Sequence, residues 1–158
     1  MTNQPSENNS AFEISYSLYL EEMTGTFNRR CNQFCYFIQM FLGASVFANA
    51  SFGWLLGIVI AFISALQFTM KFGEKAGNAK AQSHRYRVLL DASPSLTTDE
   101  ILKQQHVIEK DDTAVLTSLY NPARKRASIS LYGQDVESAH PLTKWEKAVS
   151  FIGGGIPE

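Results

Sequence analysis

Residues 31–70 form a run of 40 residues without Asp, Glu, Lys, Arg, His or Pro, and this run constrains the fold more than any other feature. All 29 charged side chains of the protein lie outside it. Even a buried helix of a soluble domain usually presents a polar stripe to solvent. Because about 20 apolar residues cross a bilayer core of about 30 Å, the run is long enough for two crossings.

The run divides near Asn49-Ala50-Ser51, a small polar cluster that suits a tight turn. This division predicts membrane-spanning helices over about 32–48 and 52–72. Gln39 is the one strongly polar residue in the middle of the first helix, and in hydrocarbon its amide should face protein. We expect it to form a single interhelical hydrogen bond, with pore lining as the alternative.

Positive charge flanks the run on one side of the membrane. The basic residues before the first helix and after the second are Arg29, Arg30, Lys71, Lys75, Lys80, Arg85 and Arg87. Since Lys and Arg are enriched in cytoplasmic flanks, both termini are predicted to be cytoplasmic, with a very short loop outside. Residues 1–28 contain no Lys or Arg, so the run does not read as a secretory signal and is expected to be retained.

Small residues recur every fourth position in the second helix. The row consists of Gly53, Gly57, Ala61, Ala65 and Thr69, and the first helix offers Gly43, Ala44 and Ala48. Small side chains at this spacing allow two helix backbones to approach closely. The row therefore serves either packing within the hairpin or self-association into a homo-oligomer, and the spacing alone supports both.

The flanks of the run are predicted to be helical, which gives an all-α membrane protein with a two-helix transmembrane hairpin and cytoplasmic helices at both ends. Residues 1–10 read as disordered, and Gly25 and Thr26 are expected to bend the helix that follows. Cytoplasmic helices are predicted over 11–30, 73–92, 98–110 and 112–121, with a capping box at residues 97–100 and a helix end or kink at Pro122. Residues 131–158 form a tail with a short amphipathic helix, placed either on the membrane or against the other helices.

Chemistry-bearing motifs are absent from the sequence, so we expect no enzyme and no catalytic, cofactor-binding or metal-binding residues. Cys31 and Cys35 lack the second pair that a zinc site requires, and the three histidines are dispersed. The cluster Arg124-Lys125-Arg126 suits either lipid head groups or a solvated face. A net charge of -1 argues against nucleic-acid binding.

The order of these features resembles the SLATT domains, which are two-helix membrane modules of bacterial defence genes. The resemblance covers residues 11–130 and includes Arg29-Arg30, the two close crossings and the segment FGEKAGNAKAQSHRYRVLL, where the matching residues are Ala81, His84, Tyr86 and Leu89. It continues in IEKDDTAVLTSLYNPARKRA, around Glu109, Leu116 and Asn121.

The resemblance implies an inner-membrane effector of antiviral defence, by abortive infection. Such an effector oligomerises and perturbs the bilayer when a separate sensor detects the infection. The expected partners are therefore lipid, further copies of this chain and a sensor protein. Two alternatives remain at this point: a phage- or prophage-encoded protein that mediates superinfection exclusion, and a membrane anchor or scaffold.

Overall fold

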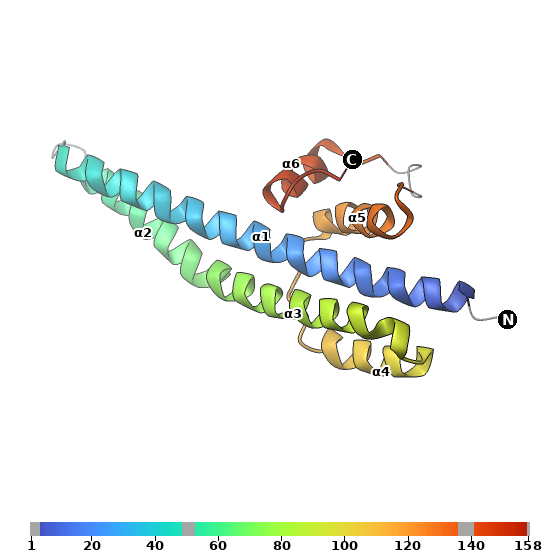
Figure 1. The fold of residues 1–158 in the computed structure, drawn as a ribbon. Helices are drawn as coiled ribbons and strands as arrows, with labels where there is room; N and C mark the ends of the chain where they lie inside the picture. The colour runs from blue at the N-terminus through green and yellow to red at the C-terminus, as the bar shows by residue number, and fades with distance from the viewer. Residues whose placement is uncertain (1–3, 49–52, 136–140, 158) are drawn as a thin grey trace.

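The computed structural model describes residues 4–48, 53–135 and 141–157, and every regular element in these ranges is helical. The molecule is elongated, and α1 (Gln4–Ala48) runs along its whole length (Figure 1). α2 (Gly53–Met70) and α3 (Phe72–Ala92) lie antiparallel to α1 along one side. α4 (Thr98–Glu109) packs against α3, whereas α5 (Tyr120–Tyr132) and α6 (Lys144–Ile152) lie on the opposite side of α1. The predicted all-α class is confirmed for these residues.

α1 is one helix of 45 residues, so the predicted lead-in helix and the predicted first crossing are continuous. The bend expected at Gly25 and Thr26 is absent. A Cβ atom built on Gly25 would lie 3.3 Å from the Cβ atom of Ala79 on α3, so this glycine permits a close approach of the two helices. The gain in helix packing outweighs the cost of a glycine inside a helix, which is about 1 kcal/mol.

The prediction of disorder over 1–10 is wrong from Gln4 onward, because α1 begins there. Pro5 lies in the first turn, where a helix tolerates a residue without a backbone N–H. Ser10 is already buried at 8% exposure. Tertiary packing therefore extends the helix into a segment whose composition is typical of a disordered tail.

α2 and α3 are separated by one residue, Lys71, whose backbone is left-handed at a φ of 51°. α2 ends at Met70, which is also the last residue of the uncharged run. Backbone hydrogen bonds of 3.0 Å from Lys71 to Gln67 and from Lys75 to Lys71 continue across the junction. The predicted ranges 52–72 and 73–92 agree with these helices to within two residues, and the turn predicted at residues 49–51 lies outside the described residues.

α4 begins at the predicted capping box. The Thr97 backbone N–H and hydroxyl donate to the Glu100 carboxylate at 2.9 and 2.7 Å. These bonds lower the pKa of Glu100. A short 3-10 turn, η2 (Ser93–Ser95), connects α3 to this start. The predicted range of 98–110 is therefore nearly that of the observed helix.

The helix predicted over 112–121 is wrong. The chain after α4 has no regular structure until a 3-10 turn, η3 (Thr117–Leu119), after which α5 begins at Tyr120. Pro122 lies in the first turn of α5 and does not end a helix, which is a position that proline favours. Residues 112 and 113 are instead held by side chains of α1 and α3, as described below.

α5 and α6 complete the fold. α5 ends at Gly133, whose φ of 71° is the left-handed conformation common after helices. α6 begins at a second capping box, in which the Thr143 N–H donates to Glu146 at 2.8 Å and the Glu146 N–H donates to the Thr143 hydroxyl at 3.2 Å. Val149 of α6 is buried, so the tail helix packs against other helices and does not lie free on a surface.

Two hydrophobic clusters form on opposite sides of α1. The first consists of Ile14 and Leu18 of α1, Tyr86 and Leu89 of α3, and Ile101 of α4. The second consists of Met23 of α1, Leu119, Ala123 of α5 and Val149 of α6. We call α3–α6 together with residues 4–30 of α1 the helical lobe. Because both clusters include α1, this one helix supports the whole lobe.

A partly buried polar network joins the segment after α4 to α1 and α3. Asp112 accepts hydrogen bonds from the Tyr86 hydroxyl at 2.9 Å and from the Gln82 amide at 3.0 Å. Glu21 of α1 accepts one from the Thr113 backbone N–H at 2.8 Å, and its second oxygen is buried without a hydrogen-bond partner among the described residues. Burial raises the pKa of Glu21 to about 7, although the bond from Thr113 opposes this shift.

The stability of the lobe should depend on the protonation of Glu21. The folded protein binds a proton there that the unfolded chain releases near its ordinary pKa of 4.5, so this stabilising contribution is complete below about pH 4.5 and lost as the pH rises to about 7. Glu21→Gln should therefore stabilise the protein on the order of 1–3 kcal/mol at about pH 8 and little at about pH 4.5. Thermal unfolding of the detergent-solubilised protein, followed by circular dichroism, measures this difference.

The matched control is Glu13→Gln, an exposed glutamate on the same helix. This variant should follow the wild type at both pH values. The prediction is wrong if Glu21→Gln and the wild type lose stability in parallel between about pH 4.5 and about pH 8.

Candidate functional site

The outer part of the α1–α2 pair carries large apolar side chains that no other element covers. We call residues 31–45 of α1 and 53–70 of α2 the apolar belt. Its exposed fractions reach 71% at Met40 on α1 and 85% at Phe68 on α2, and no residue of α2 is buried. A contiguous apolar surface of this size marks contact with lipid or with another protein.

One segment in the described part of the chain, Gly53–Ser95, is long and apolar enough to cross a membrane by length and composition. Its best 18-residue window has a mean hydropathy of 1.9, and none of that window is buried. The belt half of α1 is not apolar enough to meet the same hydropathy criterion for a membrane span. Asn32, Gln33 and Gln39 lower its hydropathy, although its aromatic side chains are as exposed as those of α2.

The two helices of the belt meet along a seam of half-buried residues. These recur at alternating spacings of three and four, as in a coiled coil. They are Cys35, Ile38 and Leu42 on α1 and Leu56, Ile60 and Ile63 on α2. The seam holds the pair together by side-chain interlocking and leaves the remaining faces outward.

Two polar contacts cross the seam. Gln39 donates to the Ser64 hydroxyl at 3.0 Å, which is the interhelical hydrogen bond that the sequence predicts for this residue. Gln67 donates to the Asn32 side-chain oxygen at 3.2 Å. Hydrogen bonds between helices in an apolar environment contribute about 1 kcal/mol each, and they fix the register of the pair.

The row of small residues on α2 faces away from α1. Gly57, Ala61, Ala65 and Thr69 are all exposed, and a Cβ atom built on Gly57 would meet nothing within 4 Å. Thr69 donates its hydroxyl to the Ala65 carbonyl at 2.9 Å, which satisfies the hydroxyl within the helix. These four residues therefore do not carry packing within the pair, and they present a shallow, apolar strip to the surroundings.

The other small residues are placed less uniformly. Gly53 is half-buried at the start of α2, Ala44 on α1 is exposed, and a Cβ atom on Gly43 would meet nothing within 4 Å. The side chain of Ala48 lies outside the described residues. Ala44 therefore lies outside the seam, as the four exposed small residues of α2 do, whereas Gly43 and Gly53 are half-buried like the seam residues.

The seven basic residues that flank the belt in the sequence differ in their partners. Lys71 forms an ion pair with Glu74 at 3.1 Å, Arg85 one with Asp111 at 2.9 Å, and Arg87 one with Glu22. Arg30 donates to the carbonyls of Phe151 and Ile152 at 2.8 and 3.0 Å, which fixes the end of α6 next to the base of the belt.

The three remaining basic residues are Arg29, Lys75 and Lys80, and within the described ranges their side chains have no hydrogen bond or ion pair. Arg29 and Lys80 line a cavity that is described below. The Arg124-Lys125-Arg126 cluster does not form one surface: Lys125 pairs with Asp135, Arg124 lies over the Phe12 ring, and Arg126 reaches the same cavity.

The part of the chain that the structure describes holds no cluster of side chains that could bind a metal ion. Cys31 and Cys35 are free thiols, and no group of three or more His, Cys, Asp or Glu side chains gathers among the described residues. Sequence reasoning missed the seam, and it named Arg29, Lys80, Arg87 and Arg126 without indicating that they line one cavity. The seam could have been predicted from its spacing of three and four residues. The cavity could not, because it joins residues more than 100 positions apart in the sequence.

Comparison with known proteins gives no relative: no protein-family model, no curated protein and no solved structure matches this chain.

The outward row should control self-association. Replacing Gly57 and Ala61 by Leu should weaken association at least about tenfold, because bulky side chains keep the backbones of two copies apart. Energy transfer between labelled chains in liposomes, measured over a range of protein-to-lipid ratios, gives the affinity. Since the row makes no contact within the pair, helix content should not change.

The control is Val59→Leu, which adds bulk at an exposed position of α2 outside the row. It should associate as the wild type does. Unaltered association of the Gly57→Leu/Ala61→Leu variant would exclude the row as the contact.

Proposed function

We propose that both helices of the belt cross a bilayer, which makes the chain a multi-pass protein of a bacterial inner membrane. The exposure of large apolar side chains on α1 as well as on α2 supports two crossings. The polar residues that lower the hydropathy of α1 are compatible with this, because Asn32 and Gln39 bond to α2. The basic residues that flank the belt support a cytoplasmic location for both termini and for the helical lobe.

The topology has a direct test. Green fluorescent protein fused to either terminus should be fluorescent in bacteria, because it folds in the cytoplasm and not after export in unfolded form. Alkaline phosphatase fused at the same positions should be inactive. A single crossing by α2 alone would place the termini on opposite sides, so one active phosphatase fusion contradicts the proposal.

We infer further that the protein is an effector of an antiviral, abortive-infection system, as its resemblance to SLATT domains implies. The observation that carries this inference is the outward row on α2. A hairpin that served only as an anchor would need its seam, but it would not need a second close-packing strip turned to the lipid. Copies that associate through this strip form an oligomer that perturbs the membrane.

The trigger in this proposal comes from a separate sensor that binds the helical lobe. α3 and α5 pack on the same continuous helix that carries half of the belt, so a partner on the lobe acts on α1 directly. No enzymatic step is part of the mechanism. The protein changes the membrane by association alone.

Membrane potential is the decisive measurement. Cells that express the chain with its neighbouring genes should depolarise after phage challenge, as reported by a potential-sensitive dye, and should die before phage release. The Gly57→Leu/Ala61→Leu variant should keep the potential at the level of unchallenged cells, while Val59→Leu should depolarise as the wild type does.

Two outcomes contradict the effector function. Depolarisation that persists in the Gly57→Leu/Ala61→Leu variant excludes the row as its cause. Protection by the chain alone, with intact potential and blocked entry of the phage genome, would show superinfection exclusion instead.

A further inference from the structure

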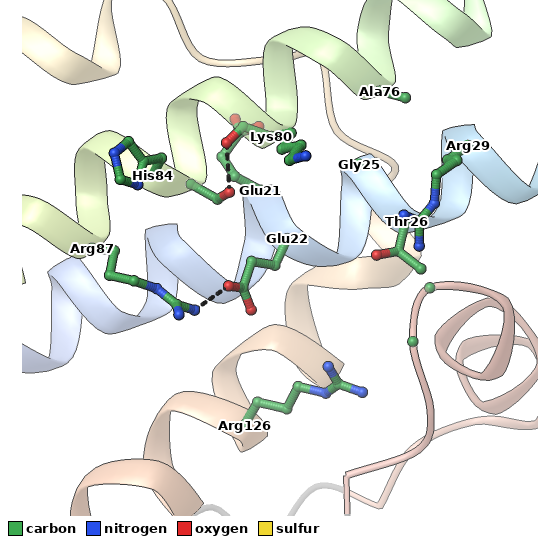
Figure 2. Close-up of a pocket in the computed structure, with 13 residues that line it drawn as sticks. Glu21, Glu22, Gly25, Thr26, Arg29, Ala76, Lys80, His84, Arg87 and Arg126 are labelled. Carbon is green, nitrogen blue, oxygen red and sulfur yellow. Dashed lines mark hydrogen bonds and ion pairs between the residues drawn. The ribbon is translucent and has the colours of Figure 1, made fainter.

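A cavity of about 470 Å³ lies at the base of the belt, where α1, α3, α5 and the loop after α6 meet (Figure 2). Its volume is in the range of small-ligand sites in proteins. Four cations and two carboxylates line it, and small residues of α1, α3 and the loop form much of the remaining wall. The charged residues are Arg29, Lys80, Arg87, Arg126, Glu21 and Glu22.

The charges in the cavity do not balance. Glu22 is neutralised by its ion pair with Arg87. Glu21 is directed to the Thr113 backbone N–H, and its pKa of about 7 leaves it partly protonated at neutral pH. Arg29 and Lys80 have no hydrogen bond or ion pair within the described ranges. The cavity is therefore electropositive, and its unpaired cations come from both α1 and α3.

Arg126 extends the positive wall from the α5 side. Its guanidinium points toward Glu22 and Thr26 on α1 (Figure 2) and donates to the Gly155 carbonyl at 2.7 Å. A Cβ atom on Gly154 would lie 3.5 Å from the Arg126 guanidinium, and the φ of 124° at this residue suits only glycine. The positive φ of the glycine loop gives it this course, and the loop holds the guanidinium by a neutral acceptor, so its charge stays available to a ligand.

The cavity lies beside the level at which the belt begins. Arg29 is two residues before Cys31, which is about 3 Å along the helix axis. Arg30 fixes the end of α6 at the same level, and Phe151 there is 68% exposed. If the belt spans the bilayer, Arg29 at the edge of the cavity lies at the head-group level and Phe151 lies next to lipid.

We propose that this cavity binds the phosphate group of an anionic phospholipid from the adjacent leaflet. The assignment rests on the proposed insertion of the belt. Arg and Lys side chains bind phosphate through charge-assisted hydrogen bonds, and Arg29, Lys80 and Arg126 supply such donors from three helices. A bound phosphate joins the lobe to the membrane surface at the point where the helix pair enters it. The position at the head-group level favours a lipid over a soluble phosphate.

Native mass spectrometry of the detergent-solubilised full chain tests this assignment with three probes. Dioctanoyl phosphatidylglycerol should bind with the highest affinity. Dioctanoyl phosphatidylcholine should bind more weakly because its choline is repelled by the cavity, and inorganic phosphate should bind weakest because it lacks the lipid part. Lys80→Gln should lower the affinity for phosphatidylglycerol at least about tenfold, as should Arg126→Gln.

The matched control is Lys75→Gln, which removes the same charge from α3 one turn nearer the membrane but outside the cavity. Its affinity should fall by no more than about fivefold, since diffuse attraction contributes about 1 kcal/mol per charge. Circular dichroism establishes that each variant is folded. Lys80 is exposed, so Lys80→Gln should fold even if Arg126→Gln does not.

Three results overturn the assignment: equal losses in Lys75→Gln and Lys80→Gln, inorganic phosphate binding as tightly as phosphatidylglycerol, or no lipid bound by the folded wild type. The second result would identify a soluble phosphate ligand. The terminal fusions and the potential measurement report separately on the proposed function. Depolarisation can therefore fail while Lys80-dependent lipid binding holds, and the reverse outcome refutes only the cavity assignment.

Discussion

The contact between α1 and α3 is the interaction on which the rest of the structure depends. It is closest where Gly25 faces Ala79, and it continues into the cluster around Tyr86. Because α3 follows α2 after one residue, the same contact determines how α2 lies along the outer half of α1. It also brings Arg29 of α1 and Lys80 of α3 to one cavity. A Cβ atom at position 25 would require Ala79 to shift by a few tenths of an ångström, so a larger residue there would strain this contact.

Polar side chains find their hydrogen-bond partners in different places in the two halves of α1. In the belt, the polar side chains that bond do so within a helix or across the seam, as Ser45 does to the Phe41 carbonyl at 2.9 Å. An apolar surrounding demands such internal satisfaction. In the lobe, charged groups cross-link elements far apart in sequence, and Glu21 keeps one oxygen without a partner among the described residues. The hydroxyls of Ser15 and Thr24 on the same helix are also buried without a hydrogen-bond partner among the described residues, so polar groups are less completely satisfied in the lobe than in the belt.

The features that the sequence predicts correctly are local ones. The capping box at Thr97 and Glu100, the end of α2 near Lys71 and the hydrogen bond from Gln39 each depend on a short segment or on one residue type in an apolar run. The error over 112–121 has a long-range cause. Bonds from Tyr86 to Asp112 and from Thr113 to Glu21 hold that segment extended, and no local pattern reveals them.

The sequence also could not predict which way the small-residue row on α2 faces. A row of Gly and Ala at every fourth position fits a helix interface of either kind, so spacing alone does not determine which face meets α1. The heptad-like seam of Ile38, Ile60 and their neighbours could have decided it, because larger side chains fill the interface within the pair. The cavity could not be predicted from the sequence, because part of its wall is the glycine loop near the C-terminus, which packs next to α1.

The unbroken course of α1 has a mechanical consequence. A helix of 45 residues is about 68 Å long, and its backbone hydrogen bonds make it stiff against torsion. Any turn of the belt about the axis of α1 therefore rotates Glu21 and Arg29 by nearly the same angle. Such a rotation would either break the hydrogen bond from Thr113 to Glu21 and the contacts of Arg29, or move the elements that form them together with α1. The continuous helix thus couples any rotation of the belt to the polar contacts of the helical lobe, without a hinge.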